Sequence, residues 1–283
     1  MPTDPRQLEV APRTRAPAAE QCLLCACRRF TDLHVPNGVV MRRCEECGLF
    51  VNVTPEHVTE NPDFYAAEYH ERHYGHSDSR KRRTSASLVR QIEAMAGRRG
   101  RLLDIGCSLG HFLAAATRRG WEAWGVDVSE DMVRRCQEHG LQARLGGLDR
   151  LPFPDAYFDV IHARHVLEHD IEVFRSLAEM RRALAADGLL FVVTPDAGCR
   201  KVRRRGADYP KFWKPDHMIC LTRQTLAEVM RRAGFAEVRT PPAAGLCIDG
   251  LAGAVPHAIW WLSDAIPDAL GLGKTLRTVW RKA

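Results

Sequence analysis

The residues that decide the fold are 101–113, Arg-Leu-Leu-Asp-Ile-Gly-Cys-Ser-Leu-Gly-His-Phe-Leu, in which an apolar segment runs into a glycine-rich loop. Short apolar runs recur along the chain, separated by stretches of helical periodicity, at 123–126, 142–145, 158–163 and 189–194. This alternation predicts an α/β fold with a doubly wound, mostly parallel sheet flanked by helices. Ligands of such sheets bind beyond the carboxyl ends of the strands, and here the first strand ends at the loop.

Glycines and acidic residues at these strand ends predict a nucleoside site. Gly106 and Gly110 let the backbone turn sharply and approach a ligand, at the start of a helix with free amides. Such loops also occur in dinucleotide sites and in structural turns. Asp127 follows the second strand, 23 residues after Asp104, where a carboxylate can accept hydrogen bonds from both ribose hydroxyls. The alternative for Asp127 is a helix cap, although Ser129 suits that position better.

Cysteine spacing near the N-terminus predicts a metal site. Cys22-x2-Cys25 and Cys44-x2-Cys47 are two knuckles within the spacing range of four-cysteine zinc sites, and residues 36–38, Pro-Asn-Gly, predict a hairpin turn between them. We expect a zinc ribbon with a structural Zn2+ and no open coordination position. Free thiols are the alternative, and Cys27 is a spare thiol that could compete as a ligand.

Composition indicates the cellular compartment but does not identify the binding partner. A net charge of +6 suits anionic small molecules as well as RNA. Residues 1–21 have no apolar secretory signal and predict a disordered tail, and the apolar region 245–273 is too interrupted by charges and prolines for a membrane span. Ten cysteines without an export signal point to the reducing cytoplasm.

The predicted organisation along the chain has five parts. The tail is followed by the ribbon at 22–60, a linker and helical lid at 61–100, the cofactor domain at 101–240 and a helical extension at 241–283 that could cap the pocket or make a homodimer. For the Tyr- and His-rich residues 61–76, packing against the main domain is as good an interpretation as a lid.

Three ordered motifs resemble a known family. Residues 103–113, 124–129 and 151–161 are similar to successive motifs of class I S-adenosylmethionine-dependent methyltransferases, which have a Rossmann-like, seven-stranded sheet. The resemblance extends to a bacterial subgroup that often carries a cysteine ribbon and modifies small molecules. It rests there on the pieces Val166-Leu-Glu-His169, Asp187-Gly-Leu-Leu190 and Pro215-Asp-His217. Ser108 stands where the family often has glycine, and we expect the loop to survive this change.

The resemblance implies the positions that bind the cofactor, S-adenosyl-L-methionine. Asp127 would hold the ribose, and Val128 and Met132 would lie against the adenine. The full set of implied cofactor-binding residues is Asp104, Gly106, Cys107, Gly110, Phe112, Asp127, Val128, Met132, Gly147 and Leu148.

Histidines near the expected sulfonium are the candidate catalytic residues. A base with a pKa near neutrality suits an acceptor that loses a proton as the methyl arrives, and His165, His169 and His217 fit that role. Similar enzymes of the ubiquinone pathway have a Glu-x-x-Glu-His arrangement associated with a divalent cation. Here His165 takes the first position, which argues against magnesium because imidazole prefers softer transition metals. The alternatives are a structural hydrogen bond for His169 and a plain loop position for His217.

The leading hypothesis is methyl transfer to an O, N or C atom of a small-molecule acceptor, which the basic residues 200–205 could grip if it is anionic. Exposed surface is the default reading of that basic run. Nucleic acid is the less favoured partner, because no aromatic-rich RNA platform stands out. The alternatives that stay open are an RNA-base methyltransferase and a protein that cyclises or cleaves S-adenosylmethionine.

Overall fold

The computed structural model describes residues 20–54, 78–238 and 274–283. Residues 1–19 of the tail, residues 61–77 of the predicted linker and lid, and residues 241–273 of the C-terminal extension lie outside the described residues. Among the helices that are described, none is long and apolar enough to cross a membrane.

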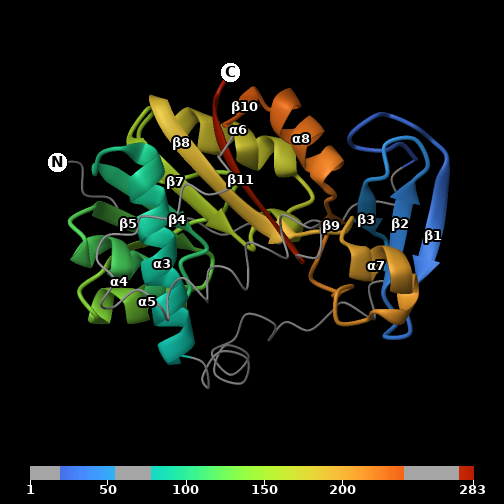
Figure 1. The fold of residues 1–283 in the computed structure, drawn as a ribbon, viewed down its shortest axis with the longest axis horizontal. Coiled ribbons are helices and arrows are strands. Elements are labelled where there is room, and N and C mark those ends of the chain that lie inside the picture. The colour runs from blue at the N-terminus through green and yellow to red at the C-terminus, as the bar shows by residue number, and fades with distance from the viewer. Residues whose placement is uncertain (1–19, 55–77, 239–273) are drawn as a thin grey trace, which may run out of the picture.

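The main body is a seven-stranded sheet in the order β10-β11-β8-β7-β4-β5-β6 (Figure 1). Its strands pair in parallel except for β11, which runs antiparallel to both neighbours. The bounds are β4 Arg101–Ile105, β5 Glu122–Asp127, β6 Gln142–Leu145, β7 Phe158–Arg164, β8 Leu184–Pro195, β10 Phe235–Glu237 and β11 Thr275–Lys282. The predicted doubly wound α/β fold is confirmed.

Helices cover both faces of this sheet. On one face pack α3 Asp78–Ala96, α4 His111–Arg118 and α5 Glu130–Glu138, and on the other pack α6 Val173–Ala183 and α8 Arg223–Arg232. Successive side chains of a strand point to opposite faces. Leu102 of β4 accordingly joins the α3–α4 core, whereas Leu103 joins the α6–α8 core.

The cysteine-rich segment forms a second, four-stranded sheet, which we call the ribbon. Strands β1 Phe30–His34 and β2 Val40–Cys44 make the predicted hairpin, and β3 Phe50–Asn52 extends it. The fourth strand, β9 Ile219–Cys220, lies much later in the sequence and pairs with β3. The predicted boundary of the ribbon is therefore incomplete, because residues of the cofactor domain finish its sheet.

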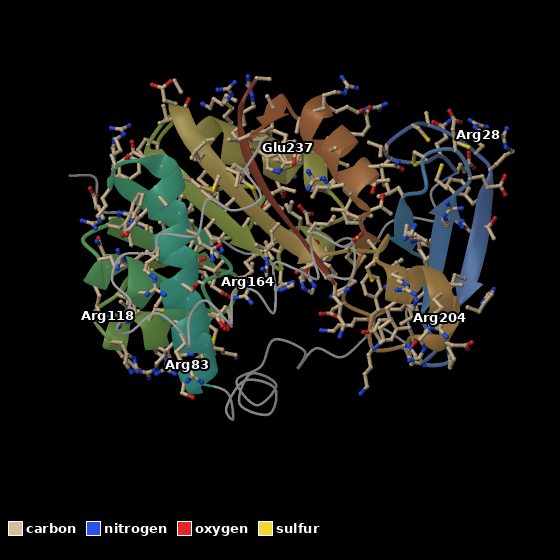
Figure 2. The ribbon with its side chains drawn as sticks, in the orientation of Figure 1. Arg28, Arg83, Arg118, Arg164, Arg204 and Glu237 are labelled. Atoms are coloured by element: carbon tan, nitrogen blue, oxygen red, sulfur yellow. The ribbon has the colours of Figure 1, made fainter. Side chains whose placement is uncertain are left out.

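A basic segment lies between the ribbon and the main body. It consists of α7 Arg200–Arg205 and the short helix η4 Gly206–Asp208, and its buried Val202 shares a small core with Met41 of β2. Figure 2 labels Arg204 on α7, beside the ribbon strands. The ribbon is thus packed against the main body of the chain.

The C-terminal segment corrects one expectation. Residues 275–280 were expected to continue an amphipathic helix, but β11 is a strand between β8 and β10. Leu276, Val279 and Trp280 are spaced as on a helix face, yet they are buried because both faces of an internal strand are covered. The helical interpretation of this segment is therefore wrong.

Candidate functional site

The glycine-rich loop lies at the carboxyl end of β4 in the expected strand–loop–helix setting. Gly106 is exposed, with φ of 70°, and a Cβ there would lie 2.9 Å from Val166 Cγ2. Gly110 precedes α4 with φ of 71°, and a Cβ there would lie 2.6 Å from Leu141 Cδ1. Both positions therefore require glycine. Ser108 also has a left-handed backbone, with φ of 47°, so the loop forms as expected despite the missing glycine.

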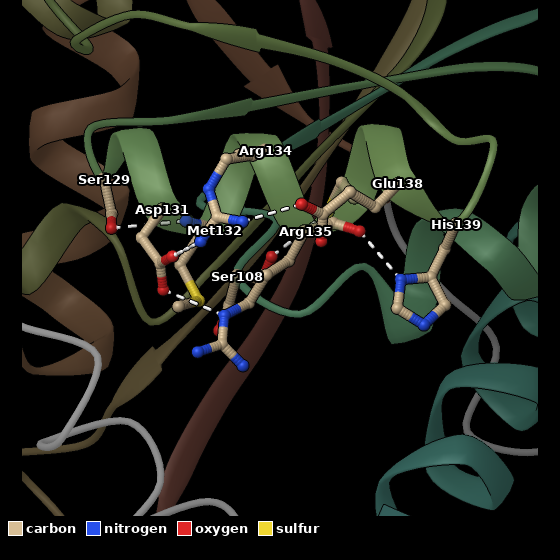
Figure 3. A network of polar contacts seen from close by, with 9 residues as sticks. Ser108, Ser129, Asp131, Met132, Arg134, Arg135, Glu138 and His139 are labelled. Carbon is tan, nitrogen blue, oxygen red and sulfur yellow. Dashed lines mark hydrogen bonds and ion pairs between the residues drawn. The ribbon is translucent and has the colours of Figure 1, made fainter.

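Asp127 ties this loop to the next strand end. Its carboxylate accepts hydrogen bonds from the backbone amides of Ser108, at 2.8 Å, and Ser129, at 2.9 Å. Ser129 itself caps α5, because its hydroxyl accepts a hydrogen bond from the Met132 amide (Figure 3). The assignment of the cap to Ser129 is confirmed. Asp127 stays half-buried at the carboxyl edge, where a carboxylate can meet a ligand.

Below the loop, Asp104 has a partner that sequence reasoning missed. Asp104 and His162 are adjacent across β4 and β7, and the Asp104 carboxylate lies 2.8 Å from His162 Nδ1. Both side chains are buried, and Phe112 stacks on the imidazole at a centroid distance of 4.0 Å. The sequence marks His162 only as a polar residue within a predicted strand, and its partnership with Asp104 depends on β4 and β7 being neighbours in this register.

The other predicted cofactor residues divide into two groups. Cys107 is buried, with its Sγ under Gly125, so that only its backbone belongs to the loop, and Met132 is 1% exposed. Val128, Gly147 and Leu148 are half-buried at the ends of β5 and β6. The sheet brings all three close to Asp127, whose carbonyl accepts a hydrogen bond from the amide of Gly146.

A cluster of histidines and carboxylates lies where β7 and β8 end. Ligand atoms of Glu168, His169 and His217 all lie within 4.8 Å of one another, and the two imidazoles meet edge to face at 5.1 Å between centroids. His165 contacts the cluster only through its Nδ1, 2.9 Å from Glu168, and its side chain is 41% exposed. The fold therefore unites the three predicted histidines, with His165 at the periphery.

Burial, hydrogen bonds and nearby charges together set the protonation states in this cluster. Burial opposes ionisation of Glu168, but the hydrogen bond with His165 and the nearby imidazoles outweigh it, so the pKa of the carboxyl lies below its usual range. Desolvation lowers the pKa of His217 to about 4. At neutral pH the cluster therefore holds an ionised carboxylate beside a neutral His217 imidazole.

The four predicted zinc ligands converge in the ribbon. Sγ atoms of Cys22 and Cys47 are 3.5 Å apart, as are those of Cys25 and Cys44, and all four lie within 4.8 Å of one another. Tetrahedral Zn–S bonds of about 2.3 Å place neighbouring sulfurs about 3.8 Å apart, so the cluster fits zinc. Burial opposes ionisation of the Cys44 thiol, but the amides of Glu46 and Cys47 outweigh it and lower its pKa to about 6.

The ribbon also forms hydrogen bonds with the loop that carries His217. Asn52 of β3 is 2% exposed, and its Nδ2 donates to the carbonyls of Pro215, at 2.9 Å, and His217, at 3.2 Å. On the other side of the same loop, the Met218 amide donates to the Glu168 carbonyl at 2.7 Å. The position of His217 is therefore fixed jointly by the ribbon and by the end of β7.

Comparison with known proteins shows the family to which the chain belongs. The family described as "Methyltransferase domain" matches residues 77–240. An uncharacterized methyltransferase, YcgJ, of Bacillus subtilis is 35% identical over 100 residues, which are 33% of this chain and 40% of that protein. The ubiquinone/menaquinone biosynthesis C-methyltransferase UbiE of Ralstonia pickettii is 29% identical over 124 residues, covering 41% of this chain and 45% of that protein. The chain thus spans less than half the length of the curated relatives that it matches.

Solved structures show the same fold. An S-adenosylmethionine-dependent methyltransferase from Archaeoglobus fulgidus superposes with a TM-score of 0.53 and 23% identity, covering 77% of this chain and all (100%) of that one. A methyltransferase from Haloferax volcanii, solved in complex with the Trm112 methyltransferase activator, has a TM-score of 0.52 and 21% identity, covering 78% of this chain and 96% of that one. These likenesses confirm the Rossmann-like sheet expected from the sequence.

Proposed function

The chain belongs to the family of class I S-adenosylmethionine-dependent methyltransferases, and on that premise we propose that it methylates a small-molecule acceptor. S-adenosylmethionine, when bound, supplies an electrophilic methyl group on a sulfonium, which a nucleophile of the acceptor displaces in line to leave S-adenosylhomocysteine. The protein has to hold donor and acceptor in that line, which is the main physical requirement of such a displacement.

The observation that carries the proposal is the pair of strand ends at Gly106 and Asp127. Gly106 offers an exposed backbone with no side chain in the way, and Asp127 offers a half-buried carboxylate already tied to the same loop. We assign Gly106, Gly110 and the buried Asp104 to the methionine half of the cofactor and Asp127 to the ribose. Val128, Gly147 and Leu148 line the adenine side, whereas the burial of Met132 and Cys107 limits these two to supporting the site from below.

The acceptor side of the site is assigned to the histidine cluster. Val166 lies against Gly106 and is two residues from Glu168, so the cluster borders the methionine end of the cofactor. There His169 and His217 would contact the acceptor, and His165 would orient Glu168. The basic helix α7 lies on the same side, next to the ribbon, and favours an acceptor with a negative group.

The proposal also includes a metal ion and a cellular compartment. We assign structural Zn2+ to the four-cysteine cluster, where thiolates and short Sγ separations suit it. Thiolate ligands are kept reduced in the cytoplasm, which is where we expect the protein to act. A homodimer stays a prediction.

Methyl transfer from labelled S-adenosylmethionine to a small-molecule extract tests the proposal. Asp127→Ala should weaken cofactor binding, measured by calorimetry, by tenfold or more, because a hydrogen-bonded carboxylate contributes about 1.5–3 kcal/mol. His169→Ala should leave that affinity within about twofold while turnover falls about 100-fold. Glu138→Ala, an exposed carboxylate at the end of α5, is the matched control and should change neither.

Two results would count against the proposal. Label that enters RNA rather than small molecules would reject the proposed acceptor class, and cofactor binding without any transferred label would reject methyl transfer. Weaker cofactor binding by His169→Ala, with an unaffected Asp127→Ala, would reject the assignment of the two sides.

A further inference from the structure

The cluster of Glu168, His169 and His217 has the composition of a transition-metal site. Its three possible ligand atoms lie within 4.8 Å of one another, and Glu168 and His217 are 1% and 4% exposed. Two imidazoles and one carboxylate are a ligand set that leaves coordination positions open for a substrate. Each of the three residues comes from the carboxyl edge of the sheet or from the loop that the ribbon holds against it.

Hydrogen bonds around the cluster prepare the ligands. The backbone carbonyl of Asp216 lies 2.8 Å from His169 Nδ1, which must therefore carry the proton and leave the lone pair on Nε2. The two Glu168 carboxylate oxygens are oriented by His165 Nδ1, 2.9 Å from Oε1, and by the Thr194 hydroxyl, which donates to Oε2 at 3.0 Å. Outer contacts of this kind commonly fix the tautomer and direction of metal ligands.

Two polar atoms in the cluster lack partners. Nδ1 of His217 and Oδ1 of Asp216 are buried and make no hydrogen bond within the described part of the chain. An unpaired buried polar atom is destabilising, so an arrangement that retains two of them on adjacent residues indicates a further ligand.

The carboxylates near the cluster give an independent reason to expect a bound cation. Glu168 and the largely buried Asp216 bring two carboxylates to one small volume, and neither forms an ion pair with a lysine or arginine among the residues described. Buried charges in proteins are normally paired or coordinate a metal. A divalent cation between Glu168 and the two imidazoles would be coordinated by the carboxylate and both rings.

From these observations we propose that Glu168, His169 and His217 bind a divalent transition-metal ion. Imidazole ligands favour Zn2+, Fe2+, Co2+ or Ni2+ over Mg2+. The ion would lie beside Gly106, because Val166 links the two, and its open positions would hold an oxygen of the acceptor. That last role rests on the proposed methyl transfer, whereas the metal site itself does not.

Titration of the metal-free protein with Co2+ tests the site directly. The protein is first stripped with a chelator and checked for its fold by circular dichroism. We expect the wild type to take up one ion more than the ribbon binds. Cobalt in the ribbon gives intense thiolate charge-transfer absorption, whereas cobalt on nitrogen and oxygen ligands gives weak visible bands alone, so the two sites are distinguishable.

Two variants and a control define the result. His169→Ala, at a half-buried position, and the nearly isosteric Glu168→Gln should each lose the second ion and its weak visible bands and keep the thiolate absorption. His139→Ala, on an exposed histidine that ends α5, should keep both. A second ion that survives both cluster variants, or a wild type that binds cobalt through thiolates alone, would overturn the proposal.

The experiment also separates this proposal from the proposed function. A second ion in a protein that transfers no methyl group would reject the function and leave the site standing. Methyl transfer by a protein that binds cobalt in the ribbon alone would do the reverse.

Discussion

Replacement of Asn52 by leucine tests whether the ribbon builds part of the functional site. The side chain is 2% exposed and makes hydrogen bonds with three backbone groups: the carbonyls of Pro215 and His217 and, at 2.9 Å, the amide of Thr54. Leucine has a similar volume, so little cavity is created, but all three groups lose their partner. At about 1–3 kcal/mol for each unpaired group, and with partial relaxation toward water, the loss in unfolding free energy should be about 3–4 kcal/mol.

Urea denaturation measures that loss, and calorimetry and turnover locate its effect. Because Asn52 contacts the His217 loop and not the glycine-rich loop, cofactor affinity should stay within about twofold while turnover falls at least tenfold. Asn37→Ala is the control: exposed Asn37 donates a single hydrogen bond to the same segment, at the Trp213 carbonyl, and should cost about 1 kcal/mol or less. Equal losses of stability in both variants, or a parallel loss of cofactor affinity and turnover, would refute the reasoning.

Three further predictions concern other parts of the molecule. Gly110→Ala should lower the unfolding free energy by about 2–4 kcal/mol, because φ is 71° and the new methyl meets Leu141; an unchanged urea midpoint would contradict this. Chelation of the Zn2+ that we propose for the ribbon should abolish turnover before it abolishes cofactor binding, as followed by parallel assays during dialysis, since the ribbon contacts the His217 loop; simultaneous loss would argue against this. Arg119 holds the pKa of Glu93 below its ordinary value, so the stability that this carboxylate contributes is complete above about pH 5 and is lost as pH falls through the lowered pKa. The unfolding free energies of wild type and Glu93→Gln should therefore differ by about 1–2 kcal/mol at pH 7 and by less toward pH 3. A difference that stays constant with pH would disprove the link.

The strand-end position of the residues that we assign to the cofactor could be predicted because its signals are local. Gly106, Gly110 and Asp127 lie directly after strands, and parallel strands align their carboxyl ends at one edge of a sheet. The same holds for the cysteine knuckles, in which each pair of ligands is three residues apart. The partnership of Asp104 with His162 was missed, since it depends on which strands are neighbours and in which register they pair.

The segment 275–282 shows why periodicity alone can fail. Leu276, Val279 and Trp280 repeat as on a helix face, but the same residues suit an internal strand that is buried on both sides. What decided between the two was the free edge of β8, which β11 occupies and which no local pattern reveals.

The sequence by itself determined the α/β class, the glycine-rich loop, the position of Asp127 at a strand end and the four-cysteine cluster, because each depends on residues close together in the chain. Only the tertiary structure decided that His217 meets Glu168 and His169, and that Asn52 of the ribbon holds it there. Contacts between such distant residues follow from strand pairing and core packing, which are properties of the whole chain. The glycine-rich loop therefore follows from local sequence, whereas the histidine cluster depends on the packing of the ribbon against the sheet.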